Sequence, residues 1–177
     1  ATAKLMADNN YKVIVFGLNE TPDLKQHDLV FVKCDVSNSK NIEQAVNQVV
    51  DTYGAIDCLI NNAGVLSYGT ATDLSESEWD HVMAVNVNGP FLCAKYTIPH
   101  MNDNAVIVNV ASVQSFVAQP FVAAYATSKA AILGLTRSIA IDFSPKVRCV
   151  AVCPGTIDTP MLRGAMEQAA DPEAMLT

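Results

Sequence analysis

The run Ala105-Val-Ile-Val-Asn-Val110, followed by Ser112 and then by Tyr125-Ala-Thr-Ser-Lys129, decides the fold of this chain. The first run is largely apolar, as a buried strand is, so we expect the Ser112 hydroxyl to emerge at the carboxyl end of a strand. Open α/β sheets bind their ligands at that end. Tyr125 and Lys129 stand four residues apart, which places them one above the other on the same face of a helix. The segment therefore predicts a strand, a loop and a helix that bring a hydroxyl, a phenol and an ammonium group together.

These three side chains suit proton transfer. A phenol has a pKa of about 10 in water, and a nearby cation favours its ionised form, most strongly where water is scarce. Tyr125 would then exchange a proton with a substrate oxygen, to which Ser112 donates a hydrogen bond. An isolated pair of this kind is more often a half-buried tyrosine beside a solvated lysine, so the interpretation depends on the other motifs.

The composition limits the kind of protein. A chain of 177 residues with 50% hydrophobic residues forms one domain with a substantial core. The formal net charge is -7 and the eleven lysines and arginines are scattered, which argues against a nucleic-acid partner. No apolar run reaches membrane-spanning length and no signal-peptide pattern is recognisable, so we expect no membrane partner.

The cysteines are expected to act as small buried hydrophobes. They are odd in number, show no CxxC spacing and lie mostly in apolar runs. The histidines offer no close-spaced metal ligands, so we expect no metal site. This pattern fits a reducing cytoplasm. The residues concerned are Cys34, Cys58, Cys93, Cys149, Cys153, His27, His81 and His100.

Strands and helices are predicted to alternate along the chain. Alternation implies parallel strands joined by crossover helices, hence a doubly wound α/β sheet with helices on both faces. Leu5 and Met6 are expected on the inner side of the first helix, and Gly134 is expected at a site of close packing or positive φ. A capping box, Ser75 to Glu78, opens the third helix. Expected strands cover residues 11–16, 29–34, 58–61, 105–110 and 148–152; expected helices cover residues 1–8, from Asn38 or Ser39 to Tyr53, 76–101 and 121–142.

Further motifs occur in a fixed order around the catalytic trio. With Ser112 and the Tyr-x-x-x-Lys pair they resemble the short-chain dehydrogenase/reductase family over nearly the whole chain. The resemblance implies a Rossmann-like fold and one dinucleotide-binding domain over residues 1–177. The motifs are Cys34-Asp-Val36, Asn61-Asn-Ala-Gly64, Asn86-Val-Asn-Gly89 and Pro154-Gly155.

The resemblance also implies a role for each catalytic residue. Tyr125 would be the acid/base catalyst, and Lys129 would lower its pKa and hold the nicotinamide ribose. Ser112 would bind and polarise the substrate carbonyl or hydroxyl. Asn86 would hold a helix in the shape that binds a proton-relay water, although alone it would read as a helix-bending polar residue.

The same resemblance implies a cofactor site at the carboxyl ends of the strands. Asp35 would contact the adenine ring, and the segment after Pro154 would hold the nicotinamide carboxamide. Read without the family, Asp35 is a turn or cap residue and Pro-Gly is a turn after a strand. The expected cofactor-binding residues are Gly17, Leu18, Asp35, Val36, Asn62, Ala63, Gly64, Tyr125, Lys129, Pro154, Gly155, Ile157 and Thr159.

Two departures from the family pattern affect the cofactor. The glycine-rich turn that cradles the pyrophosphate is not found, and the sequence begins inside the helix that should follow it. We therefore expect part of a longer protein, with the fold incomplete at both ends. At the position that selects the cofactor, Gly17-Leu-Asn-Glu20 has neither an aspartate in register nor an arginine. The choice between NAD and NADP stays open, with a slight preference for NAD because this segment holds no cation.

The substrate and the partners are predicted in outline. Gln114, with Ser67-Tyr68, could line the substrate pocket beside Ser112 and Tyr125 and would suit a sugar or polyol; the alternative is ordinary loop polarity. Residues 156–177 resemble the lid over the substrate. The helices at 76–101 and 121–142 correspond to those that form homodimers, commonly within homotetramers, in relatives.

The sequence thus favours an NAD(P)-dependent alcohol or sugar dehydrogenase, or a carbonyl reductase, acting on a small molecule. The competing hypothesis is a non-catalytic binding or regulatory protein that retains the fold. A dehydratase or epimerase of the extended relatives fits less well, because those enzymes usually carry a longer substrate domain.

Overall fold

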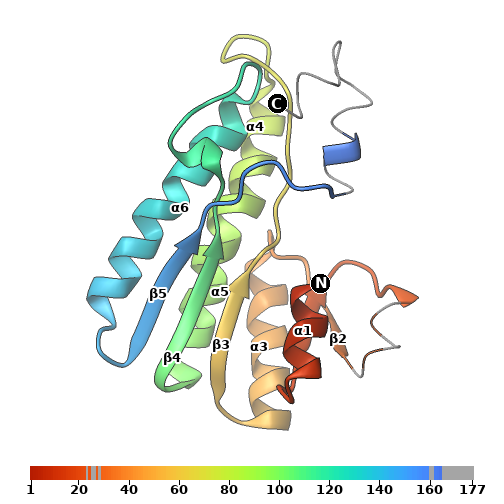
Figure 1. Ribbon diagram of the computed structural model, residues 1–177, viewed down its shortest axis with the longest axis vertical. Coiled ribbons are helices and arrows are strands. Elements are labelled where there is room, and N and C mark those ends of the chain that lie inside the picture. Colours follow the sequence, from red (N-terminus) through yellow and green to blue (C-terminus); the bar gives the residue numbers. More distant parts are fainter. Residues whose placement is uncertain (23, 25–26, 28, 160–161, 165–177) are drawn as a thin grey trace.

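The computed structural model describes residues 1–22, 24, 27, 29–159 and 162–164 (Figure 1). Strands and helices alternate along these residues, as the sequence predicts. The strands are β1 (Ile14–Gly17), β2 (Val30–Lys33), β3 (Ile56–Asn61), β4 (Met101–Val110) and β5 (Val147–Val152). The helices are α1 (Thr2–Asp8), α3 (Ser39–Tyr53), α4 (Glu76–Met83), α5 (Gly89–Thr97) and α6 (Ala123–Asp142).

All paired strands are parallel. Strand β1 pairs with β2, and β4 lies between β3 and β5 in a separate ladder. The register sets Asn61 opposite Asn109, and Val110 opposite Val152. The carboxyl ends of β3, β4 and β5 therefore meet at one edge, where the loops that carry the predicted site residues begin. The α/β class with parallel strands is confirmed.

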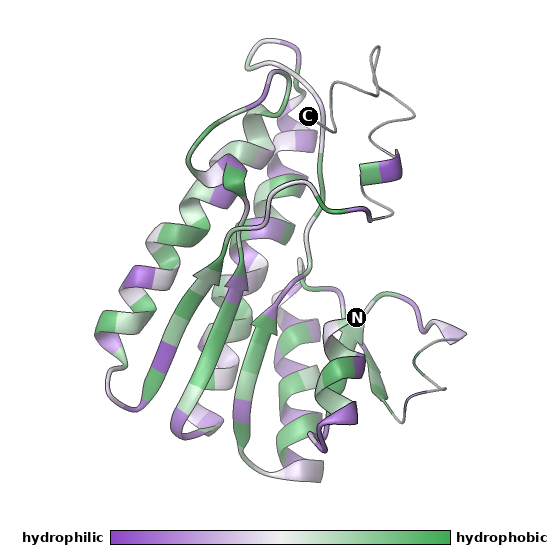
Figure 2. Cartoon of the chain, in the orientation of Figure 1, coloured by the Kyte–Doolittle hydropathy of each residue, from purple (hydrophilic) through white to green (hydrophobic). Residues whose placement is uncertain are grey.

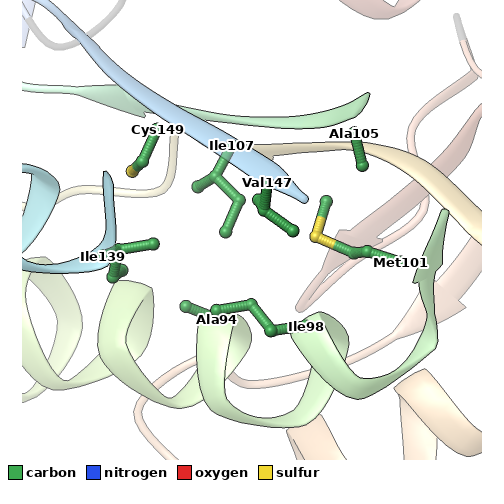
Figure 3. Close-up of a cluster of buried hydrophobic side chains, with 8 residues drawn as sticks. All are labelled: Ala94, Ile98, Met101, Ala105, Ile107, Ile139, Val147 and Cys149. Carbon is green, nitrogen blue, oxygen red and sulfur yellow. The ribbon is translucent and has the colours of Figure 1, made fainter. Parts of the chain in front are cut away.

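Helices α5 and α6 cover one face of the three-stranded ladder. The strands are predominantly hydrophobic (Figure 2), and a cluster of buried side chains fills the layer between strands and helices (Figure 3). Burial of this apolar surface is the main force that holds α6 against the ladder. The cluster comprises Ala94, Ile98, Met101, Ala105, Ile107, Ile139, Val147 and Cys149.

The opposite face is less covered within the described residues. Val150 and Val152 alternate with the buried side chains of β5 and remain 42% and 50% exposed. Helix α1 lies on the side of the strands opposite to α3 and α5 (Figure 1) and contributes no buried residue. The expected inner position of Leu5 is wrong, since its side chain is 63% exposed.

A second core joins the two-stranded ladder to the helices. It contains Val32 and Cys34 from β2 and its end, Ile42, Ala45 and Val46 from α3, and Cys93 from α5. Burial raises the pKa of the Cys34 thiol to about 11, helped by the Asp35 carboxylate, and that of Cys93 to about 12. Both cysteines therefore behave as small hydrophobes, as predicted. Within the residues that the structure describes, no group of His, Cys, Asp and Glu is arranged to hold a metal ion, and no helix could cross a membrane.

The predicted helix starts are confirmed at two positions. Asn38 caps α3, because its side chain accepts hydrogen bonds from Lys40 N and Asn41 N. Ser75 and Glu78 form the predicted capping box of α4. The expected long helix over residues 76–101 is interrupted by a π-helical turn at Ala84–Asn88 and ends in a 3-10 turn at Ile98–His100.

Candidate active site

Ser112 stands just beyond β4, at the edge where the strands end. It is 8% exposed, and its Oγ accepts a hydrogen bond of 3.2 Å from Gln114 N. Val113 N donates to Pro154 O at 2.9 Å, so the Ser112 loop lies against the segment that follows β5. Because Ser112 Oγ acts as an acceptor toward Gln114, its own O–H is available to donate to a substrate oxygen.

Lys129 reaches from α6 back to β4. Its Nζ donates a hydrogen bond of 2.8 Å to Val110 O and lies 5.6 Å from the centroid of the Tyr125 ring. The side chain is 4% exposed, and burial lowers the pKa of its ammonium group because desolvation disfavours the charged form. The predicted proximity of Tyr125 and Lys129 on one helix face is therefore found. Ser115 Oγ donates to Lys129 O at 2.8 Å and ties the Ser112 loop to the same turn of α6.

Asn86 connects the loop after β3 to α6. Its Oδ1 accepts from Val65 N at 2.8 Å, and its Nδ2 donates to Val65 O at 2.9 Å and to Ser128 Oγ at 3.0 Å. Asn86 lies within the π-helical turn and is 1% exposed. A Cβ added to Gly64 would lie 3.5 Å from both Asn86 Oδ1 and Lys129 Nζ. The structure thus brings four of the predicted residues, Gly64, Asn86, Tyr125 and Lys129, into one neighbourhood.

Asn62 and Ala63 are exposed in the turn that begins where β3 ends. Gly64, which follows them and is partly exposed, lies beside Lys129 Nζ. This turn is therefore placed where a ligand of Lys129 could also contact main-chain atoms.

The predicted adenine side lies where β1 and β2 end. Cys34 N donates to Gly17 O at 2.9 Å, which brings Gly17 next to the Cys34-Asp-Val36 motif. Asp35 Oδ1 accepts from Ser37 N at 2.9 Å and from Ser37 Oγ at 2.7 Å, and these bonds lower the pKa of the Asp35 carboxyl group. Both bonds end on Oδ1. Asp35 can therefore stabilise this turn and still offer Oδ2 to an adenine ring.

Two further features near this edge bear on the proposed cofactor site. A Cβ added to Gly89 would lie 3.1 Å from Val36 O, so this glycine permits close approach of the Val36 backbone. Lys33, which is exposed, stands opposite Gly17 in the β1–β2 register. A cation is therefore present close to exposed Leu18, although it is supplied by the neighbouring strand and not by the segment after Gly17.

The segment after β5 is described only as far as residue 159 and again at residues 162–164. Gly155 and Ile157 are exposed, the latter by 55%. Thr159 Oγ1 accepts from Leu162 N at 3.3 Å, and its carbonyl accepts from Arg163 N at 3.0 Å. Most of the expected lid, residues 156–177, lies outside the described residues.

Of the predicted substrate residues, Gln114 lies beside Ser112, and Ser67 and Tyr68 lie in the loop after β3. Gln114 Oε1 accepts from Gln119 N at 2.9 Å, so this oxygen shapes the loop before α6. Tyr68 is 37% exposed, and burial of part of its ring raises the pKa of its hydroxyl. A groove of about 340 Å³ lies where α4 and α6 begin, but no predicted site residue lines it. It is lined by Ala71, Leu74, Glu76, Trp79, Asp80 and Ala123.

This arrangement of motifs also appears in known proteins. The family model for short chain dehydrogenase matches residues 1–170. The chain belongs to the short-chain dehydrogenase family. The family includes NAD(P)-dependent oxidoreductases with a Rossmann-like fold, and the fold class and the general enzyme class predicted from the sequence are confirmed.

Similar proteins include dehydrogenases and oxidoreductases. An uncharacterised oxidoreductase of Thermotoga maritima is 38% identical over 98% of this chain and 73% of its own length. The 2-(R)-hydroxypropyl-CoM dehydrogenase of Xanthobacter autotrophicus is 44% identical over 77% of this chain and 57% of its own length. These names disfavour the non-catalytic alternative.

Solved short-chain dehydrogenase structures superpose closely on this chain. Ligand-free aldohexose dehydrogenase of Thermoplasma acidophilum matches with a TM-score of 0.91 and 38% identity, over 98% of this chain and 69% of that one. Gluconate 5-dehydrogenase of Burkholderia cenocepacia, solved with NADP and tartrate, matches with a TM-score of 0.86 and 27% identity, over 95% and 70%. The chain spans between 57% and 73% of the length of the four relatives named here.

Proposed function

We propose that this protein transfers a hydride between a nicotinamide dinucleotide and the hydroxyl or carbonyl carbon of a small alcohol or sugar. The observation that carries the proposal is the position of Lys129 Nζ. It contacts Val110 O, lies beside the Tyr125 ring, and would be 3.5 Å from a Cβ at Gly64. One buried cation thus faces the end of the Ser112 strand, the predicted acid/base residue and the predicted cofactor loop.

The donors at Lys129 fit the ribose of a nicotinamide nucleotide. An ammonium group carries three N–H donors, and in the described part of the chain Lys129 Nζ makes one hydrogen bond, to Val110 O. Neighbouring ribose hydroxyls would accept from the remaining donors. Asn62, Ala63 and Gly64 would contact the same nucleotide through their backbone. When bound, the nicotinamide supplies or accepts the hydride.

The proton is handled by this chain's own residues. In the direction of oxidation, Tyr125 takes the proton from the substrate hydroxyl; in reduction it returns that proton to the carbonyl oxygen. Ser112 donates its O–H to the same oxygen and stabilises the charge that develops there. Asn86 keeps the loop after β3 fixed to α6 through Val65 and Ser128.

A sugar or polyol is the favoured substrate class. Gln114 lies beside Ser112, Ser67 and Tyr68 would add further polar groups to the pocket, and two of the superposing structures are named for an aldohexose and for gluconate. A second candidate is a substrate with an apolar substituent. Phe116 and Phe121, on the loop between Ser112 and α6, are 70% and 60% exposed and would favour it.

The cofactor is proposed to be NAD or NADP, with a slight preference for NAD. The position after Gly17 lacks an arginine, which supports NAD, whereas Lys33 on the adjacent strand is a cation that a 2′-phosphate could use. We further propose a cytoplasmic protein that forms a homodimer or homotetramer through α4, α5 and α6.

The proposal is tested by titrating the purified protein with NADH and NADPH and by following nicotinamide absorbance with aldohexoses, polyols and apolar secondary alcohols. We expect micromolar binding of one dinucleotide and turnover with at least one substrate class. Binding without any turnover would favour the non-catalytic alternative, and absence of binding would contradict the proposed cofactor site.

A further inference from the structure

A buried chain of hydrogen bonds crosses the layer between the strands and α6, below the candidate active site. Asn61 Nδ2 donates to Asn109 Oδ1 at 2.8 Å, and Asn109 Nδ2 donates to Thr136 Oγ1 at 2.9 Å. Thr136 Oγ1 in turn donates to Ile132 O at 2.7 Å. Asn109 Nδ2 also approaches Cys149 Sγ at 3.5 Å. These hydrogen bonds therefore link β3, β4, β5 and α6.

Asn61, Asn109 and Thr136, which make these hydrogen bonds, each lie close in sequence to a residue of the candidate site. Asn61 immediately precedes Asn62, in the proposed cofactor loop. Asn109 is three residues before Ser112, on the same strand and its extension. Thr136 follows Lys129 by seven residues, which is close to two full turns, so both project from the same face of α6.

This series of hydrogen bonds constrains the position of α6 along the strands, which the surrounding apolar core does not. Apolar burial is non-directional and would tolerate a small slide of α6 along the strands. A buried amide that loses its partner incurs a desolvation cost, so the Asn109–Thr136 bond favours one axial position of the helix. Asn109 is 0% exposed and Thr136 is 7% exposed, so solvent is not placed to replace either group.

We propose that Thr136 is a positioning residue that, through Asn109, fixes the height of α6 at which Lys129 reaches Val110 O and lies beside the Tyr125 ring. The inference rests on the proposed function, because the height of α6 matters for turnover only if these residues act on one substrate oxygen. Ser115 Oγ, which donates to Lys129 O, provides the second attachment at the upper end of the helix.

The test replaces Thr136 by valine, which keeps the side-chain volume and removes the hydroxyl. Thr136→Val is expected to lower kcat by about 10- to 100-fold with KM changed by no more than about twofold, because misplacement affects the transition state and not substrate binding. Thr136→Ser should restore most of kcat. Thr97→Val is the matched control, since Thr97 is an equally buried threonine on α5 outside this chain of bonds, and its kcat should stay within about twofold of wild type.

A second readout does not need turnover. With 13C-labelled lysine, the Lys129 resonance, identified by its loss in Lys129→Arg, reports the pKa of Lys129 by NMR titration. Burial lowers this pKa, and Thr136→Val should move it toward that of an exposed lysine, whereas Thr136→Ser and Thr97→Val should not. If Thr136→Val does not fold, Thr136→Cys, whose sulfur is a weaker acceptor, takes its place with the same expected order.

Either an unchanged kcat or an unchanged Lys129 pKa in Thr136→Val would overturn the positioning role. If the wild-type protein turns over none of the substrates, the proposed function fails, and the Lys129 titration alone then decides whether Thr136 positions the helix. The two failures are therefore distinguishable.

Discussion

Lys129, the proposed ligand of the nicotinamide ribose, lowers the free energy of unfolding because its charge is buried. Its ammonium group is 4% exposed and has Val110 O as its hydrogen-bond acceptor in the described chain. A buried cation with one neutral acceptor is unfavourable, which is the reason its pKa is lowered. The unfolded chain, in which Lys129 is solvated, therefore binds the proton more tightly than the folded chain does.

The sign of this linkage gives a prediction. Below the folded-state pKa, Lys129 is charged in both states and the cost of burial is present in full; the cost disappears as pH rises from that value to the unfolded value of about 10.4. Lys129→Met should therefore have a higher free energy of unfolding than wild type at pH 7, and the difference should shrink at pH 10. Urea denaturation at both pH values measures it. A less stable Lys129→Met at pH 7 would mean that the bond to Val110 O outweighs desolvation.

At the residue scale, the sequence predicted the proposed catalytic residues but not the residues that form hydrogen bonds around them. Tyr125 and Lys129 follow from helical spacing, and Ser112 follows from its place after an apolar run. Ser128 and Thr136 gave no signal of their own, because their partners Asn86 and Asn109 are 42 and 27 residues away in sequence. Asn109 was detectable as a polar residue within the otherwise apolar run of residues 105–110.

At the scale of elements, the π-helical turn at Ala84–Asn88 separates two helices that the sequence predicts as one. Hydrophobic periodicity cannot reveal such a turn, since one inserted residue shifts the helix face only locally. The turn places Asn86 toward Val65 and leads into Gly89, which adjoins Val36. It therefore connects the Cys34-Asp-Val36 motif to the neighbourhood of Val65 and Ser128.

Gly89 in α5 and Gly134 in α6 give opposite predictions. A Cβ at Gly89 would lie 3.1 Å from Val36 O, whereas nothing lies within 4 Å of one at Gly134. Gly89→Ala should lower the free energy of unfolding by about 1 kcal/mol or more and weaken NADH binding, because the Val36 backbone must move. Gly134→Ala, in the interior of α6, should raise it by roughly 0.5–1 kcal/mol. Chemical denaturation and NADH titration of both variants measure these effects.

Gly134 also corrects the sequence prediction. Close packing or positive φ was expected there, yet the space beside it is open and its φ is not in the positive range. A destabilising Gly134→Ala would contradict the view that this part of α6 is free within one chain and would point to a contact with a second copy.

Two strands begin at other residues than the sequence pattern predicts. Strand β4 begins at Met101, four residues before its apolar run, and Asn102 Nδ2 donates to Asp57 Oδ1 at 2.7 Å across the neighbouring strand start. Such pairing depends on tertiary contacts and leaves no trace in periodicity. Strand β1, by contrast, starts at Ile14, three residues later than predicted.

At the scale of the whole molecule, the outer surfaces of α4, α5 and α6 expose large apolar side chains. Trp79, Phe91 and Ile141 are 37%, 50% and 78% exposed. Protein interfaces bury large apolar side chains of this kind, so these three residues are compatible with the proposed self-association. The sequence predicted these helices, but it could not show which of their faces stays uncovered, because that depends on how α5 and α6 pack on the strands.

Self-association can be tested by light scattering after size-exclusion chromatography. The wild-type protein should have the mass of a dimer or tetramer, and Phe91→Glu should shift it toward the monomer, because a buried carboxylate without a partner is unfavourable. Gln44→Glu, on the exposed side of α3, is the charge-matched control and should leave the mass unchanged. A monomeric wild-type protein would contradict the proposal.

The most direct measurement of the central claim compares Tyr125→Phe with wild type in both turnover and dinucleotide binding. The substitution removes only the phenolic oxygen, so the ring that lies 5.6 Å from Lys129 Nζ remains. We predict that kcat falls by about 100-fold or more, as expected for the loss of a general acid/base, while the Kd for the nicotinamide dinucleotide changes by less than about threefold. Near-normal turnover by Tyr125→Phe would contradict the assignment of Tyr125 as the group that exchanges the substrate proton.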